Sequence, residues 1–254
     1  MPTANAAWSA TGWVSRMIYS QPSSARELRV CRLGRQPYQK VEALQQSLVA
    51  QRIAGDIPDT LLLLEHDPVF TLGRRADPAH ILVSEEVLAR ERVAVCCSER
   101  GGDVTYHGPG QLVAYPILSL NNLGIGPSDY MHLLEDAGAG VAAGYGLATH
   151  RCEGLVGVWI GRNKLAALGV RIRGAVCYHG LALNVDPNMA HWAMIIACGI
   201  TDGGVTSLAA ELGYAPDMAE VQERFCDSLC DIFSMRPTEI PVELLEMSAE
   251  GELQ

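Results

Sequence analysis

Lysine is almost missing from this 254-residue chain, in which Lys40 and Lys164 are the only lysines among 19 Lys and Arg residues. An arginine guanidinium does not lose its proton in proteins, whereas a lysine ammonium can. A chain with so little lysine is expected to keep one where the chemistry needs proton transfer. Lys40 falls in a helical pattern, on its exposed side. Lys164 begins an apolar strand pattern and is the stronger candidate, with a solvated hairpin lysine as the alternative.

Long apolar runs are also absent, and none approaches the roughly 20 residues that a membrane-spanning helix needs. An apolar fraction of 48% still supplies a substantial core. The net charge of -10 disfavours nonspecific binding to nucleic acid or to anionic membranes, so neither is expected as a partner. An acidic protein partner would need a local basic patch, for which the candidates are Arg162, Arg171 and Arg173.

No secretory signal precedes the eight cysteines, whose spacing is irregular, so reduced thiols are expected. No C-x-x-C pair occurs, which disfavours a structural zinc site, and no metal is predicted. Cys96, Cys97 and Cys177 fall in strand-like runs that favour burial as small hydrophobic residues.

Internal repeats and a linker are lacking as well, so one α+β domain is expected over residues 28–236. Residues 1–27, which contain no acidic residue before Glu27, are interpreted as a flexible extension or a transit peptide. Residues 237–254 are expected to form a loose acidic tail. Within the domain, helices are predicted after Pro37, Ser84, Pro127 and Asp217, and strands at 28–33 (ended by Gly34), 60–64, 93–95, 112–118, 157–160, 164–172 and 176–185.

Glycine is concentrated in the stretch Arg100–Gln111, which reads R-G-G-D-V-T-Y-H-G-P-G-Q. Four glycines and a proline in twelve residues predict a loop whose backbone can approach a ligand closely. The stretch matches neither the dinucleotide-binding nor the phosphate-binding glycine pattern. A tight hairpin connection with polar decoration is the alternative.

Cys198 lies where the apolar run Ile195–Ile200 breaks into a loop, a position from which a thiol can face a pocket. A free cysteine is only a few per cent thiolate at neutral pH, so a nucleophilic role needs an activating group. A nearby ammonium typically lowers a thiol pKa by about 1–3 units. From the residues alone, the activator is either Lys164 or a histidine.

The order of residues in the glycine stretch resembles the lipoyl(octanoyl) transferase family, and the resemblance extends over roughly residues 28–235. It includes the segment Glu65–Gly73, the residue Asn184 and the stretch Thr206–Leu208. One departure is Ala197, where the family usually has proline before its catalytic cysteine. The resemblance implies that Cys198 and Lys164 are catalytic, and that the substrate is bound by Arg100, Gly101, Gly102, Asp103, Val104, Thr105, Tyr106, His107, Ala167, Leu168, Gly169, Gly180, Leu181 and Ala182.

The same resemblance implies the fold of the lipoyl and biotin protein ligases and transferases, with mixed sheets flanked by helices. It implies transfer of an octanoyl group from octanoyl-acyl carrier protein, through a thioester on Cys198, to a lysine of a lipoyl domain. The acceptors would be 2-oxoacid dehydrogenase subunits and the glycine-cleavage H protein. No cofactor is expected, because the donor is already activated. The expected compartment is the cytoplasm, or the mitochondrial matrix if residues 1–27 are a transit peptide.

Three other functions stay open. An ATP-dependent lipoate or biotin protein ligase would share the fold. A cysteine acyl hydrolase would pair Cys198 with His107 or His179. A nonenzymatic acyl-binding or lipoyl-domain-binding protein would function without Cys198.

Overall fold

The computed structural model describes residues 25–197 and 204–245. In these residues one large mixed sheet has the strand order β12-β1-β2-β6-β10-β9-β8-β7, with β11 paired to β9, and a small sheet has the order β4-β3-β5. The strands are β1 (Arg26–Gln36), β2 (Asp59–His66), β3 (Val69–Leu72), β4 (Ala94–Cys97), β5 (Val104–His107), β6 (Gln111–Ser119), β7 (His150–Cys152), β8 (Leu155–Ile160), β9 (Asn163–Arg173), β10 (Val176–Asn184), β11 (Gly204–Val205) and β12 (Met235–Glu239).

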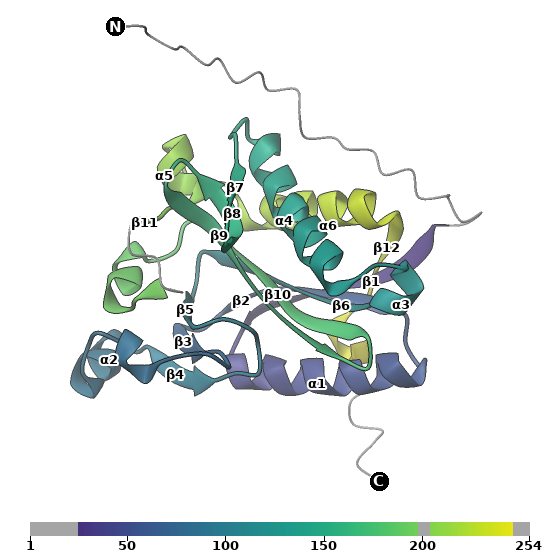
Figure 1. The fold of residues 1–254 in the computed structure, drawn as a ribbon, viewed down its shortest axis with the longest axis horizontal. Helices are drawn as coiled ribbons and strands as arrows, with labels where there is room; N and C mark the ends of the chain where they lie inside the picture. Colours follow the sequence, from purple (N-terminus) through teal and green to yellow (C-terminus); the bar gives the residue numbers. More distant parts are fainter. Residues whose placement is uncertain (1–24, 198–203, 246–254) are drawn as a thin grey trace, which may run out of the picture.

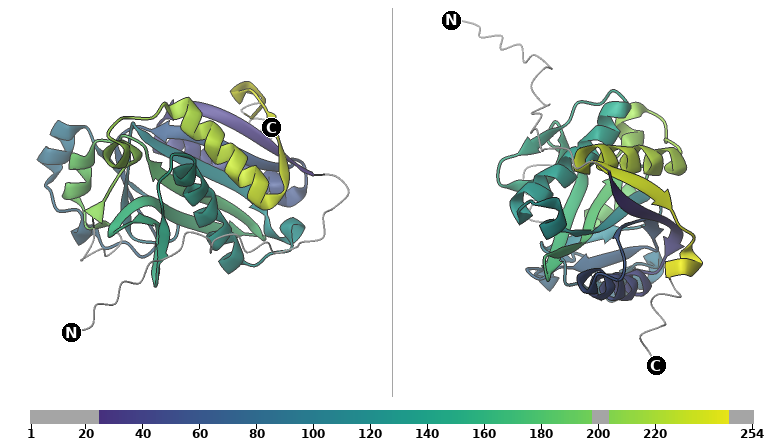
Figure 2. Two further views of the ribbon diagram at one scale, coloured as in Figure 1. Left: turned by 90° about the horizontal axis from the view of Figure 1, so that it is seen from above. Right: turned by 90° about the vertical axis from the view of Figure 1, so that its right-hand side faces the viewer.

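Helices cover both faces of the large sheet, as Figures 1 and 2 show. The helix α1 packs against β6 and β10 on one face, and α4 and α6 pack on the other. The helices are α1 (Tyr38–Ala54), α2 (Glu85–Glu91), α3 (Leu120–Leu123), α4 (Pro127–Gly144), α5 (Leu208–Leu212) and α6 (Met218–Phe233), with short 3₁₀ turns η1 (Pro78–His80) and η2 (Met189–Met194). The α+β fold with mixed sheets flanked by helices is thus confirmed.

The long helices form where the sequence pattern places them. In α6 the side chain of Asp217 accepts a hydrogen bond from the backbone N–H of Glu220, which satisfies one of the exposed amides at the helix start. The residues Val221, Phe225 and Leu229 recur at helical spacing and are fully buried against the sheet and α4. None of the helices described is both long and apolar enough to cross a membrane.

The glycine stretch is more regular than expected, because Val104–His107 forms the strand β5 instead of a loop. This strand pairs with β3 in antiparallel register, from Leu72 opposite Val104 to Val69 opposite His107. The prediction failed because glycines flank these four residues but do not occur within them. The loop is therefore divided into residues 100–103 before β5 and residues 108–110 after it.

Two predicted boundaries are wrong. Gly34, expected to end the first strand, forms a bulge at a left-handed φ of 63°, after which β1 continues to Gln36. The chain is not loose at Pro237, because β12 includes this residue and pairs with β1 in parallel register. Leu245 is also buried, against the side of the sheet that α1 covers.

The set of buried cysteines differs from the predicted one. Cys177 is fully buried as expected, and Cys226 and Cys230 are buried on α6. Cys97 is exposed and Cys96 is half-buried, because β4 is an edge strand of the small sheet and is covered poorly. The strand-like sequence around Cys96 and Cys97 did not reveal that they lie on an edge strand.

Candidate functional site

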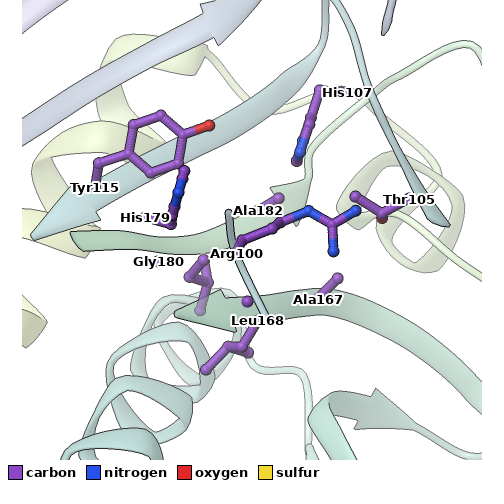
Figure 3. Close-up of a pocket in the computed structure, with 11 residues that line it drawn as sticks. Arg100, Thr105, His107, Tyr115, Ala167, Leu168, His179, Gly180 and Ala182 are labelled. Carbon is purple, nitrogen blue, oxygen red and sulfur yellow. The ribbon is translucent and has the colours of Figure 1, made fainter. Parts of the chain in front are cut away.

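A pocket lies between the large sheet, the small sheet and the loop at residues 100–103 (Figure 3). Its wall comes from three stretches of the chain that the sequence singled out, together with two residues that it did not assign to substrate binding. The lining residues are Arg100, Thr105, His107, Tyr115, Ala167, Leu168, Gly169, His179, Gly180, Leu181 and Ala182.

The floor of the pocket is made of small residues that face each other across β9 and β10. Ala167 pairs with Ala182, and Gly169 pairs with Gly180. Because side chains alternate along a strand, these two pairs lie on the same face of the sheet. That face consequently carries a shallow depression where larger residues would fill the space.

The loop at residues 100–103 covers the glycine pair. The backbone N–H of Gly101 donates to the carbonyl of Val170 at 3.1 Å. A Cβ at Gly169 would lie 3.1 Å both from the Cδ of Arg100 and from the carbonyl oxygen of Gly101, tighter than ordinary contact. Glycine at position 169 therefore lets the loop lie directly on β9.

Arg100 lines the pocket and also fastens the loop to β3. Its Nε donates to Thr71 Oγ1 at 3.0 Å, its Nη1 donates to the Gly101 carbonyl at 3.0 Å, and its Nη2 donates to Thr71 Oγ1 at 2.9 Å. The side chain is almost fully buried, so these charge-assisted bonds satisfy most of a guanidinium removed from water. The Arg100 side chain is therefore a rigid part of the pocket lining.

Five predicted substrate-binding residues do not line the pocket: Gly101, Gly102, Asp103, Val104 and Tyr106. Asp103 accepts from His80 Nδ1 at 2.6 Å, and this contact ties the loop to η1. Tyr106 shares a hydrogen bond with His191 Nδ1 at 2.9 Å and packs edge-on against Trp192, and burial raises its pKa to about 12. These contacts hold the loop and β5, which carry the pocket-lining residues, in position.

Two histidines and a tyrosine form a buried polar cluster at the pocket. His66 Nδ1 donates to the Gln36 carbonyl at 2.9 Å, so its Nε2 accepts from the Tyr115 hydroxyl, also at 2.9 Å. Burial lowers the pKa of His66 to about 4. Burial, followed by the nearby His66, lowers the pKa of His107 well below its ordinary value. Both rings are thus neutral at physiological pH.

His179 and Tyr115 are the pocket-lining residues that the sequence did not single out as part of the site. Tyr115 stands in a strand of mainly aliphatic residues, which was the one available signal. His179 has a left-handed φ of 55°, a conformation that is uncommon for residues other than glycine. A single sequence does not show such a conformation.

Lys164 lies at the start of β9, on the same strand as the pocket floor, and only 6% of it is exposed. Its Nζ is 4.8 Å from the centroid of the Trp159 ring, whose face favours the charged ammonium. Gly157 leaves space for the lysine stem, because a Cβ there would lie 3.0 Å from Lys164 Cε. The alternative of a solvated hairpin lysine is excluded.

Cys198, the predicted nucleophile, lies outside the described residues. On the near side of the gap, Ala197 is half-buried and packs with the cluster around Trp192 and Ile195. On the far side, Val205 pairs in register with Lys164, and Thr206 N donates to the Lys164 carbonyl at 3.0 Å. The described chain is thus beside Lys164 at Val205, about seven positions after residue 198.

A buried chain of amide groups joins the pocket to this returning segment. His107 Nδ1 donates to Gln111 Oε1 at 2.8 Å, Gln111 Nε2 donates to Asn184 Oδ1 at 2.9 Å, and Asn184 Nδ2 donates to the Thr206 carbonyl at 2.9 Å. All of these side chains are buried. The chain fixes the orientation of His107 relative to the segment beside Lys164.

Replacing Asn184 tests this connection. Asn184→Ala is expected to lower the free energy of unfolding by about 1–3 kcal/mol, because buried donors and acceptors lose their partners. Asn184→Asp is expected to be worse, since a carboxylate oxygen would face the Thr206 carbonyl. Urea unfolding of both variants and the wild type measures the difference. Equal stability of the three proteins would contradict the role of the chain.

The candidate basic patch does not form as one surface. Arg162 precedes β9, whereas Arg171 and Arg173 lie near its other end, so about nine residues, or roughly 30 Å of strand, separate them. In the described residues, no group of three or more His, Cys, Asp or Glu side chains is arranged to hold a metal ion.

Known proteins match this chain over most of its length. The family described as the lipoyl protein ligase A/B catalytic domain matches residues 37–230. A protein of Chloroflexus aggregans named octanoyltransferase is 50% identical over 215 residues, which cover 84% of this chain and 97% of that protein. A mitochondrial octanoyltransferase of Arabidopsis thaliana is 41% identical over 215 residues, covering 83% of this chain and 91% of that protein.

Among solved structures, lipoate-protein ligase A bound with ATP superposes with a TM-score of 0.75 over 89% of this chain and 93% of that one, at 15% identity. This likeness confirms the fold that the sequence resemblance implied. The family match and the two relatives show that the chain belongs to the lipoyl protein ligase A/B catalytic domain family, among its octanoyltransferases.

Proposed function

We propose that the protein transfers an octanoyl group from octanoyl-acyl carrier protein to the acceptor lysine of a lipoyl domain. The observation that carries this proposal is the position of Lys164 on β9, the same strand whose Ala167–Gly169 segment forms the pocket floor. An acyl group bound in the pocket can therefore extend along the strand toward a buried amine. The octanoyltransferase relatives support the same reaction.

The proposed reaction has two steps. The Cys198 thiolate attacks the thioester carbonyl of the donor, the bond to the carrier sulfur breaks, and the carrier thiolate takes a proton from the Lys164 ammonium. The acceptor amine then attacks the octanoyl-Cys198 thioester, forms the amide and releases the Cys198 thiolate. The proton lost by the amine returns to Lys164, so the enzyme ends as it began.

Lys164 suits this role because of its surroundings. Burial disfavours a charged ammonium, while the Trp159 ring favours it. Lys164 also lies on the strand that forms the pocket floor, from which its amine can give and take a proton at a bound acyl group. The pocket histidines suit the role less well, because His107 is hydrogen-bonded to Gln111 and His179 lies at the pocket end away from Lys164.

The proposed acceptors are the lipoyl domains of 2-oxoacid dehydrogenase subunits and the glycine-cleavage H protein. The reaction is proposed to occur in the cytoplasm, or in the mitochondrial matrix if residues 1–27 are a transit peptide. Because lipoate-protein ligase A has a similar fold, ATP-dependent ligation is the alternative that the experiment must separate.

Intact-protein mass spectrometry tests the proposal. Wild-type enzyme mixed with octanoyl-acyl carrier protein without ATP is expected to gain one octanoyl group that hydroxylamine removes, and Cys198→Ala is expected to gain none. Addition of a lipoyl domain should move the group to that domain. Absence of the adduct, together with ATP-dependent modification of the lipoyl domain by free octanoate, would establish the ligase instead. Release of free octanoate without transfer would establish the hydrolase.

A further inference from the structure

The pocket has a defined end on the side away from Lys164. In Figure 3, Tyr115 and His179 lie together at one end, and Thr105 and Ala167 lie toward the other. The pairing of β9 with β10 gives the same order, with Ala167–Ala182 followed by Gly169–Gly180 and then Val170–His179. His179 and Tyr115 are 1% and 4% exposed, so this end is closed.

The closed end exists because His179 departs from strand alternation. Its neighbours Cys177 and Leu181 belong to the core under α4, and strict alternation would place His179 with them. The positive φ instead turns its ring to the face covered by α1, where it stacks on Tyr178 at 4.8 Å and meets the Tyr115 ring edge-on at 6.0 Å. Its backbone N–H donates to Gln45 Oε1 of α1 at 2.8 Å, which holds the turn.

The His179 ring is both rigid and polar. Within the described residues, neither of its ring nitrogens has a hydrogen-bond partner, although both are buried. The floor in front of the ring is Gly180 and Gly169, which offer nothing polar from side chains. The ring therefore limits a longer chain by its volume, because Tyr178 and Tyr115 pack against it and hold it in place.

The spacing along β9 suits an acyl chain of about eight carbons. From Lys164 to Ala167 is about 10 Å and to Gly169 about 17 Å, at 3.3–3.4 Å per residue. An extended octanoyl chain spans about 9 Å from carbonyl to methyl, at roughly 1.25 Å of advance per 1.5 Å carbon–carbon bond. The Lys164 side chain leans along β9 toward Ala166, because a Cβ at Gly157 would lie 3.0 Å from Lys164 Cε and 2.8 Å from the Ala166 carbonyl oxygen. A carbonyl held near the tip of this side chain therefore starts about two residues, or roughly 7 Å, along the strand. The terminal methyl of a chain about 9 Å long then lies close to Gly169, and the next group along the pocket is His179.

We propose that His179 is a specificity-determining residue that sets the upper length of the acyl chain, by closing the pocket beyond the small pairs Ala167–Ala182 and Gly169–Gly180. This inference rests on the proposed acyl transfer and adds its chain-length limit. Chains shorter than octanoyl leave the glycine pair uncovered, and longer chains meet the imidazole.

The test measures kcat/KM for hexanoyl-, octanoyl-, decanoyl- and dodecanoyl-acyl carrier protein. His179→Gly, which tolerates the left-handed backbone, is expected to raise the decanoyl-to-octanoyl ratio about tenfold or more, since a hydrophobic site discriminates at least this much per methylene. Ala167→Leu fills the floor and is expected to shift the preference toward hexanoyl. Ala175→Gly is the matched control, because Ala175 has a φ of 60° in the turn of the same hairpin and lies outside the pocket.

A second readout does not depend on activity. Thermal stabilisation of each variant by free fatty acids of six to twelve carbons should follow the same shift in preference. An unchanged ratio and an unchanged fatty-acid preference in folded His179→Gly would overturn the length limit while leaving acyl transfer intact. A wild type that forms no acyl adduct, but whose fatty-acid preference lengthens in His179→Gly, would retain the length limit and remove the proposed reaction.

Discussion

Replacing Lys164 with methionine is expected to lower the rate of octanoyl transfer by about 10²–10⁴-fold, the usual contribution of a positioned acid–base group. Methionine keeps much of the length and apolar volume of the lysine stem, so the contacts around Trp159 should survive. Lys164→Arg is expected to fail nearly as badly, because a guanidinium carries the charge but does not release the proton. The combined result would separate proton transfer from simple charge stabilisation.

Single-turnover kinetics with octanoyl-acyl carrier protein measures the first step directly. Lys40→Met is the matched control, since Lys40 is exposed on α1 and does not line the pocket, and this variant is expected to leave the rate unchanged. Thiol alkylation by iodoacetamide across pH 6–9 should also show less Cys198 thiolate in Lys164→Met. Full activity of Lys164→Met would move the acid–base role to another residue.

Acidification from pH 7 to pH 5 is expected to destabilise the fold substantially. Burial lowers the pKa of His66 to about 4 and of His179 to about 3, and it lowers that of His107 as well. In the unfolded chain a histidine has a pKa near 6.5, so between pH 6.5 and the folded value the unfolded state binds protons that the folded state excludes. Stability is therefore complete above about pH 6.5 and is lost as pH falls.

The expected size is roughly 2 kcal/mol at pH 5 for each of His66 and His179, with His107 acting in the same direction. This is a large part of the 5–15 kcal/mol that stabilises a typical domain. Urea unfolding at pH 7, 6 and 5 measures the slope. His179→Gly should reduce the slope, whereas His132→Gln, at an exposed position on α4, should not. Equal unfolding free energies at pH 7 and pH 5 would contradict neutral buried histidines.

Much of the fold was predictable because its main elements carry strong local patterns. The helices α1, α4 and α6 have apolar residues at helical spacing after clear start residues. The strands β6 and β10 are buried throughout, and β2 is buried except at Glu65. Short or weakly patterned elements were missed, and β5 and β12 show why. The four residues of β5 are too few to show a period between glycines, and β12 is mostly exposed, with a proline at its centre. Its pairing with β1 is a tertiary effect that no local pattern carries.

The candidate site was predictable only in part, for a related reason. The resemblance singled out Ala167–Gly169 and Gly180–Ala182, and these residues line one pocket together. It did not separate residues that face the pocket from residues that hold it in place, as Asp103 and Tyr106 do. It also did not reveal His179 as the end of the pocket, because a left-handed turn inside a strand leaves no mark on residue spacing.

The strand β1 needs β12, the last strand described, to satisfy the hydrogen bonds on its outer edge. Arg26 is opposite Met235, so this contact joins residues about two hundred positions apart. During synthesis β1 can pair with β2 early, but its outer edge has no strand to bond until β12 leaves the ribosome. An unpaired edge is a template for intermolecular pairing. Pairing with β12 therefore protects the outer edge of β1, and the chain is more vulnerable to aggregation for as long as β12 is unpaired.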